Sequence, residues 1–279
     1  MDILSGFSGM AKGYVVGLAS LLLLFMVIEI VFPHAEEQAP TSARLKGILF
    51  AAVYAPFAFV TTLVLSAMWR AVGVTPLLPD LAPPGLPRPV GLIVAALAAA
   101  FIGDFFYYWA HRAQHRFFWR FHAVHHSVRR MSGAAAYHHV TETFFKIVLY
   151  AAPLSLLTQD PYGMPVIGAL ISLQGNYLHS PTRLHFGPVG RYLVDNRFHR
   201  IHHAIEPELH DKNFGVFTTL WDSLFGTAYF PVKDEWPATG VADFPEPAGV
   251  VDYLTAPFTW RAGASVEAPA LGEAANPTA

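Results

Sequence analysis

The chain has 279 residues, of which 53% are hydrophobic and 14% are charged, and its mean hydropathy is +0.37. Soluble domains average about 25% charged residues, so this composition favours a protein that has lipid around much of its surface. The formal net charge of -2 argues against a nucleic-acid partner, and the absence of cysteine excludes disulfides, thiolate zinc sites and cysteine-ligated iron–sulfur clusters.

Three long apolar runs occupy the first part of the chain. The first, Val15 to Phe32, contains Glu29 as its only charge, and the second, Gly47 to Trp69, is uncharged. The third, Val90 to Trp109, is interrupted only by Asp104. Because about 20 helical residues cross the roughly 30 Å hydrocarbon core of a bilayer, each run is predicted to be a transmembrane helix.

The segments between and after these runs differ in composition. Residues 73–89 carry six prolines and are predicted to be a loop. Two shorter apolar arms, Thr143 to Leu157 and Met164 to Leu178, flank a turn-rich stretch and are predicted to form a membrane hairpin. The last residues are rich in Ala, Pro, Gly and Glu, and we expect disorder from about residue 263.

Basic residues indicate which way the chain crosses the membrane. Five arginines lie just beyond the third apolar run: Arg112, Arg116, Arg120, Arg129 and Arg130. Since cytoplasmic loops are enriched in Lys and Arg, this side is predicted to be cytoplasmic and the amino terminus to lie on the other side. The chain is therefore expected to be a multi-pass integral membrane protein.

Eight of the 14 histidines form three short clusters: His111 with His115, then His122 with His125 and His126, then His199 with His202 and His203. Helical residues three or four apart project from one face, so each cluster can direct two imidazoles at one ion. A single metal site needs three or four ligands. Eight clustered imidazoles therefore predict a site for two metals, on helices just outside the apolar spans.

Other interpretations of the histidines have to be weighed. A basic helix on a membrane surface would explain Arg116 and Arg120, but not the recurrence of histidine at helical spacing. Bis-histidine haem proteins usually place single histidines inside apolar spans, unlike these clusters. A membrane zinc hydrolase and a non-enzymatic metal-binding or transport protein stay open, because imidazole suits Fe, Zn, Cu and Ni alike.

The ordered set of motifs resembles the fatty acid hydroxylase / sterol desaturase superfamily, which comprises membrane di-iron oxygenases. The similarity covers residues 90–230, about half of the chain. Its pieces are DFFYYWAHRAQH from Asp104, HAVHHS from His122, His179-Ser180 with Arg183-Leu184, RFHRIHH from Arg197, DKNFG from Asp211 and WDSLFGT from Trp221. The resemblance divides the chain into residues 1–89 (two transmembrane helices and the Pro-rich loop), 90–230 (the catalytic domain) and 231–279 (a C-terminal extension).

The resemblance implies an all-α, polytopic membrane helical bundle with a cytosolic histidine-rich cap over two iron ions. The implied metal ligands are His111, His115, His122, His125, His126, His179, His199, His202 and His203. His139 is a further candidate ligand, because it falls where many members have a His-Pro-x-Glu segment, although here Val140 replaces the proline. Four polar residues are expected to orient the ligand rings by hydrogen bonds: Asp104, Asp211, Asn213 and Asp222. For Asp104, the alternative is a hydrogen bond to another helix.

The implied reaction is the O2-dependent hydroxylation or desaturation of a lipid C–H bond, in a sterol, a fatty acyl chain or a related lipid. Because the sequence has no Rossmann or flavin fingerprint, electrons are expected from a separate donor, a ferredoxin or a cytochrome b5-type protein with an NAD(P)H reductase. The sequence leaves open which lipid reacts and whether the product is an alcohol, an alkene or a cleaved ether. Trp221, Phe225 and Phe214 are expected to pack as aromatics at the boundary between cap and membrane.

Overall fold

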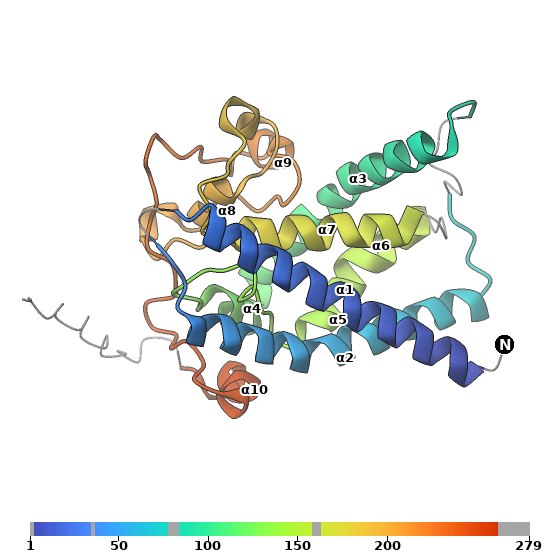
Figure 1. The fold of residues 1–279 in the computed structure, drawn as a ribbon, viewed down its shortest axis with the longest axis horizontal. Helices are drawn as coiled ribbons and strands as arrows, with labels where there is room; N and C mark the ends of the chain where they lie inside the picture. Colours follow the sequence, from blue (N-terminus) through green and yellow to red (C-terminus); the bar gives the residue numbers. More distant parts are fainter. Residues whose placement is uncertain (1–2, 35–36, 78–83, 158–162, 262–279) are drawn as a thin grey trace, which may run out of the picture.

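The computed structural model describes residues 3–34, 37–77, 84–157 and 163–261, and in these residues all regular structure is helical. Long helices make up one part of the molecule, with α5 and α6 beside them, and most of the other short helices and loops gather at one end (Figure 1). The long helices are α1 (Ile3–Val31), α2 (Thr41–Ala71), α3 (Arg88–Phe117) and α7 (Gly163–His179). The prediction of an all-α fold is confirmed.

Among the residues that the structure describes, two helices are long and apolar enough to cross a membrane, namely α2 and α3, and both coincide with predicted spans. In α1, the apolar stretch within the fully described residues is Val15–Val31. Helix α2 continues through Pro56 without interruption. Helix α3 has a proline in its first turn, where the missing N–H costs no hydrogen bond, and continues without a break to Phe117. One helix therefore carries both an apolar span and the first pair of histidines.

The arms of the predicted hairpin are helical. The first arm consists of α5 (Glu142–Lys146), the π-helical turn η1 (Ile147–Ala151) and α6 (Ala152–Leu157), and the second is α7. The turn between them, residues 158–162, lies outside the described residues. Helix α7 packs against α3 where Ala96 and Ala99 meet Leu170 and Ile171. Small side chains on α3 allow this close approach, which brings the end of α7 beside the histidine-bearing end of α3.

The remaining elements form the cap at one end of the molecule. They are α4 (Trp119–His126), η2 (Gly187–Arg191), α8 (Asn196–His202), η3 (Pro207–Leu209), α9 (Leu220–Leu224) and α10 (Val250–Thr259). Helix α8 begins at an N-cap, because the Asp195 carboxylate accepts a hydrogen bond from the Phe198 N–H at 3.0 Å. A core cluster that includes Phe50, Tyr137 and Tyr253 joins α2, the segment after α4, and α10.

The N-terminal helices also hold the cap in place. The buried Glu29 of α1 accepts hydrogen bonds from Arg44, Ser132 and the Gly133 N–H, and Glu37 forms an ion pair with Arg200 of α8. Residues on both sides of the predicted boundary at 89/90 are therefore packed together, and that division, like the one at 230/231, stays a prediction. The segment predicted to be disordered lies outside the described residues.

Candidate metal centre

The structure brings nine histidines together in two groups, and within each group the candidate ligand atoms lie within 4.8 Å of one another. Helices α3, α4 and α8 supply the first group: His111, His115, His122, His126 and His202. Helices α4 and α8, the end of α7 and the residue after α8 supply the second: His125, His179, His199 and His203. The adjacent pairs of the H-x-x-H-H motifs divide between the groups, because neighbouring helical residues point in different directions.

The hydrogen bonds of the first group show which nitrogens are free to bind an ion. His111 Nδ1 lies 2.8 Å from the carbonyl oxygen of Phe214, and His122 Nδ1 lies 3.2 Å from Glu142 Oε1. These oxygens are acceptors, so in each ring the proton is on Nδ1 and Nε2 carries a lone pair. The two Nε2 atoms face each other at 2.9 Å. Two facing lone pairs repel unless a cation lies beside both, so this contact fits a metal ion.

The second group repeats this arrangement. His125 Nδ1 donates to the carbonyl of Tyr137 at 2.9 Å, and His179 Nδ1 donates to the carbonyl of Gly175 at 2.7 Å. His179 Nε2 then lies 3.2 Å from the Nε2 atoms of both His125 and His199. Backbone carbonyls therefore turn the lone pairs of these rings toward a common point.

Among the remaining rings, two have a hydrogen-bond partner at Nδ1, and some ring nitrogens have no hydrogen-bond partner. His202 Nδ1 donates to the carbonyl of Lys212 at 2.7 Å, and His115 Nδ1 lies 3.1 Å from Asp211 Oδ1. His202 Nε2 and both ring nitrogens of His203 are buried without a hydrogen-bond partner. Buried polar atoms are rarely left unpaired, so these nitrogens are a second observation that fits a metal.

Burial also sets the protonation state of the rings. Removal from water disfavours the imidazolium form and lowers the pKa of His122 to about 4. The same cause, together with repulsion between neighbouring rings, holds five other pKa values well below the ordinary value, those of His125, His126, His199, His202 and His203. These imidazoles are neutral at pH 7, which is the form that binds metals.

The structure places His139 outside both groups. Its Nδ1 lies 2.8 Å from Thr141 Oγ1 and its Nε2 lies 3.3 Å from the carbonyl oxygen of Leu254. The neighbouring His138 lies closer to the centre, where it stacks on His125 with ring centroids 3.9 Å apart.

A buried glutamate that the sequence motifs do not identify lies beside the first group. Glu142 accepts a hydrogen bond from Gln114 Nε2 at 3.0 Å as well as contacting His122, and its Oε2 lies 3.1 Å from His138 Nδ1. His122, His138 and Glu142 form a third cluster that could hold an ion. The i,i+4 spacing of His138 and Glu142 was the available sequence signal.

The four polar residues expected to orient ligand rings act in two ways. Asp211 contacts the ring of His115 directly. The Asp104 carboxylate instead accepts from the backbone N–H groups of residues 216–218, and Asp222 accepts from the N–H groups of Phe214 and Gly215. Asn213 bonds the backbone of residues 198 and 229. These three residues fix the backbone segment whose carbonyls orient the rings of the first group.

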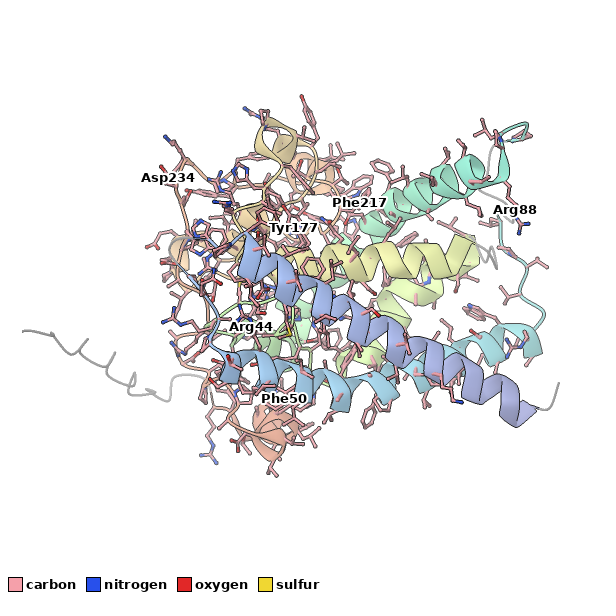
Figure 2. The ribbon with its side chains drawn as sticks, in the orientation of Figure 1. Arg44, Phe50, Arg88, Tyr177, Phe217 and Asp234 are labelled. Atoms are coloured by element: carbon pink, nitrogen blue, oxygen red, sulfur yellow. The ribbon has the colours of Figure 1, made fainter. Side chains whose placement is uncertain are left out.

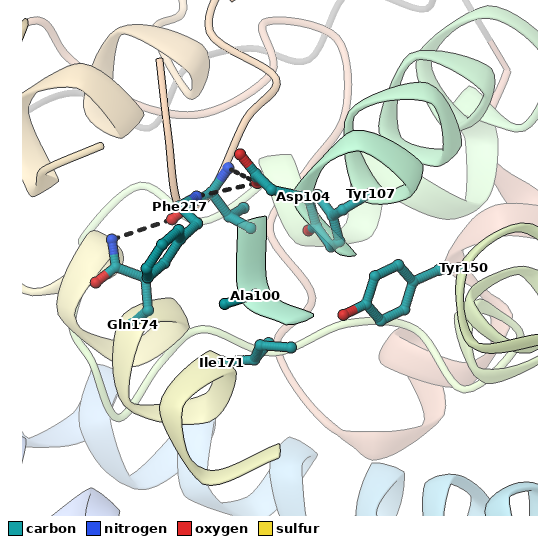
Figure 3. A pocket seen from close by; sticks show the side chains of 8 residues that line it. Ala100, Asp104, Tyr107, Tyr150, Ile171, Gln174 and Phe217 are labelled. Atoms are coloured by element: carbon teal, nitrogen blue, oxygen red, sulfur yellow. Dashed lines mark hydrogen bonds between the residues drawn. The ribbon is translucent and has the colours of Figure 1, made fainter. Parts of the chain in front are cut away.

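A pocket lies between α3, η1, α7 and residues 216–217 (Figure 3). Its polar residues are turned away by bonds to the backbone: Gln174 Nε2 donates to the carbonyls of Val194 and Val216, and Asp104 is engaged as described. The walls that remain are mostly apolar or aromatic. Tyr107 links the pocket to the first histidine group, because its ring packs against Tyr150 on one side and against His111 on the other, with centroid distances of 5.8 and 5.3 Å.

Comparison with known proteins gives the same family as the motifs. Residues 96–227 match the family described as fatty acid hydroxylase. Ornithine lipid hydroxylase OlsE of Rhizobium tropici is 31% identical over 188 residues, which are 65% of this chain and 53% of that protein. Alkylglycerol monooxygenase of Danio rerio is 30% identical over 176 residues, 58% of this chain and 37% of that protein. The Caenorhabditis elegans alkylglycerol monooxygenase is 28% identical over 149 residues, 50% of this chain and 28% of that protein.

The matched region spans about half of the Rhizobium protein and less of the animal proteins. No solved structure matches the chain. The family match covers eight clustered histidines and His179, and the helices that bear them are those that build the two groups. Residues 96–227, which carry all nine histidines of the two groups, therefore match the fatty acid hydroxylase family.

Proposed function

We propose that this protein is a membrane-bound oxygenase that hydroxylates a lipid C–H bond at a centre of two iron ions. The observation that carries the proposal is the convergence of nine buried or nearly buried imidazoles in two groups, with Nε2 lone pairs facing one another. Two groups of five and four ligands match a two-metal centre better than the three protein ligands of a catalytic zinc.

The donor set fits two ions in distance as well as in number. At a metal–nitrogen distance of about 2.1 Å, two ligands at right angles lie about 3 Å apart. The Nε2 pairs of His111 with His122 and of His115 with His126 are 2.9 and 3.2 Å apart. The first group would hold one ion and the second group the other. Iron is the proposed metal because of the family, since imidazole by itself does not distinguish iron from zinc.

When bound, the two ferrous irons would supply the reduction of O2 that makes an unactivated C–H bond reactive. The protein's own residues do the rest. Backbone carbonyls and Glu142 hold the rings in one orientation, and burial keeps the rings neutral and water away from them. Electrons come from a separate ferredoxin or cytochrome b5-type donor. The arginines after α3 support a cytoplasmic position for the histidines and therefore for this donor.

A lipid substrate is supported by the pocket and by the relatives. The apolar pocket beside Tyr107 lies between α3 and α7, so an acyl or alkyl chain that enters it comes close to the first histidine group. The named relatives are a hydroxylase of ornithine lipid and a monooxygenase of alkylglycerol, which favours hydroxylation over desaturation and a lipid with a polar head group.

The test combines metal analysis with lipid analysis. We expect the purified protein to bind two irons per chain, and membranes that contain it to gain lipids carrying one oxygen atom from 18O2. Replacement of two ligands together, His202→Ala with His203→Ala, should abolish both results. The matched control is His185→Ala, which removes an exposed histidine outside both groups and should leave both unchanged.

Two results would overturn the proposal. One is a wild-type protein that binds a single zinc and no iron, which would favour a hydrolase. The other is oxygen incorporation that survives in the double variant with metal content intact. Metal binding without any lipid oxidation in the presence of a competent electron donor would support the metal-handling interpretation instead.

A further inference from the structure

Two short elements of the cap expose a set of apolar side chains. From η2 and the residues after it come Val189, Tyr192 and Leu193, and from α9 and its C-cap come Leu220, Leu224 and Phe225. We call these six residues the η2–α9 patch. Tyr192 is 73% exposed and Leu224 is 64% exposed. Exposed apolar side chains gathered on one surface indicate a partner.

The two elements form one surface although about 30 residues separate them. Leu193 and Thr218 form an isolated antiparallel bridge, and the Thr219 N–H donates to the carbonyl of Tyr192 at 3.1 Å. Thr219 Oγ1 also donates to the carbonyl of Arg191 at 2.6 Å. These bonds fix η2 and α9 relative to each other, so the patch is a preformed surface.

The patch continues the lipid-facing surface of α3. The Trp221 ring of α9 packs on Phe101 and Phe105, with centroid distances of 5.5 and 5.0 Å, and Phe225 packs on Trp109 at 5.0 Å. Phe101 and Trp109 are themselves exposed on a helix that is apolar enough to cross a membrane. Figure 1 shows α9 beside the end of α3 that enters the cap. The patch therefore lies beside the second half of the apolar run of α3.

The charges around the patch suit a phospholipid surface. Arg191 is exposed in η2 itself, and the guanidinium of Arg112 lies 5.3 Å from the centre of the Trp109 ring. The acidic residue of α9, Asp222, is buried and accepts hydrogen bonds from backbone N–H groups and Thr227, so it presents no negative charge to the outside. Tryptophan and tyrosine beside arginine, at the end of an apolar span, are typical of the membrane–water interface.

We propose that η2 and α9 form a second membrane contact, in which the η2–α9 patch enters the boundary between head groups and acyl chains. Arg191 and Arg112 would then face lipid phosphates. This contact lies on the side of the bilayer that holds the histidine groups. Together with the spanning helices, it fixes the position of the cap relative to the membrane surface. It does not depend on the metal or on the proposed reaction, so it can be tested separately from both.

The test uses the absence of cysteine from the chain. Leu224→Cys and Val232→Cys are matched variants, because both side chains are 64% exposed and apolar. Val232 lies two residues from Asp234, which Figure 2 places at the opposite end of the molecule from Arg88, the first residue of α3. Each variant is labelled with a fluorophore and reconstituted in vesicles of phosphatidylcholine with phosphatidylglycerol.

We expect the label at residue 224 to be quenched by nitroxide-bearing lipids and to be shielded from iodide at least about threefold relative to the label at residue 232. Equal quenching of both labels by iodide would overturn the proposal. Shielding that persists in dilute detergent, with energy transfer between labelled copies, would also overturn it, since that result identifies a second copy of the chain as the occupant. A Tyr192→Cys variant repeats the measurement on η2, and an unchanged midpoint of thermal unfolding shows that each variant is folded.

Discussion

Glu142 provides the sharpest test of how the metal centre is held. The carboxylate is fully buried and is the acceptor for His122 Nδ1 at 3.2 Å and for Gln114 Nε2 at 3.0 Å. Glu142→Ala leaves both donors buried without an acceptor. Because each unpaired buried donor costs about 1–3 kcal/mol, the loss of stability should be about 2–6 kcal/mol.

The same substitution should weaken metal binding by more than instability alone explains. Without the carboxylate, His122 has no partner that fixes its proton on Nδ1, and its Nε2 is no longer held as a lone pair toward the ion. Loss of such an orienting partner usually lowers metal affinity about 10- to 100-fold. The affinity is measured by competition with a chelator in detergent or nanodiscs, and stability by the midpoint of thermal unfolding with and without metal.

Two further variants separate orientation from packing. Glu142→Gln keeps an oxygen that can accept from His122, so it should recover much of the affinity that Glu142→Ala loses. Asp211→Ala removes the partner of His115, but that carboxylate is 76% exposed, so water can replace it and the effect should be small. If Glu142→Ala binds both ions as tightly as the wild type, Glu142 does not orient His122 and the reasoning fails.

Three other changes have expected outcomes. The pKa of His122 is lowered to about 4 in the folded protein, so as pH falls the unfolded chain takes up a proton at this residue before the folded protein does. The stability of the metal-free protein should therefore drop between about pH 6.5 and 4, by about 3 kcal/mol from this ring. The measurement is the pH dependence of thermal unfolding. Gly47→Val should cost about 3 kcal/mol or more in detergent melting assays, because a Cβ at this position would lie 2.4 Å from the Ala134 carbonyl oxygen. Glu37→Ala leaves the buried guanidinium of Arg200 without its ion pair and should cost about 3–5 kcal/mol in the same assay.

Each of these predictions has its own control. Unchanged melting of the metal-free protein from pH 7.5 to 4.5 would show that the rings are not held neutral by burial. Gly17→Val, where a Cβ would meet nothing within 4 Å, should melt like the wild type. Lys46→Met breaks a more exposed ion pair with Glu246 and should cost at most about 1 kcal/mol. Equal losses in the Glu37 and Lys46 variants would contradict the role assigned to burial.

The helical spacing of the histidines predicted much of the site. His111 and His115 share one face of α3 and enter the same group, as residues four apart on a helix should. His122 and His126 behave in the same way on α4. Periodicity works here because each cluster lies on a regular helix, where sequence separation fixes direction.

Where the backbone is irregular, the pattern could not choose between neighbours. Residues 137–141 precede α5 and are not helical, so nothing in the sequence showed that His138 turns toward His125 while His139 turns toward Leu254. The most frequent hydrogen-bond partners of the rings, backbone carbonyls such as those of Phe214 and Gly175, could not be predicted either. Every residue has a backbone carbonyl, so the amino-acid type does not show which one accepts a hydrogen bond.

Asp104 shows the same limit from another direction. It lies seven residues before His111, two turns away on the same face of α3. The structure shows that it reaches the N–H groups of residues 216–218 and not a ligand ring. That loop is more than 100 residues from Asp104 in the sequence. A local sequence pattern cannot predict such a long-range contact.

The unbroken course of α3 has a mechanical consequence. The same rigid helix spans the bilayer and carries His111 and His115, whereas His199, His202 and His203 belong to the cap. A bilayer thicker or thinner than about 30 Å is accommodated partly by helix tilt, and a tilt of α3 would displace its two imidazoles relative to those of α8. We therefore expect the fit of the centre to its ions to vary with the acyl length of the surrounding lipid, so that bilayer thickness becomes a variable that tunes metal retention.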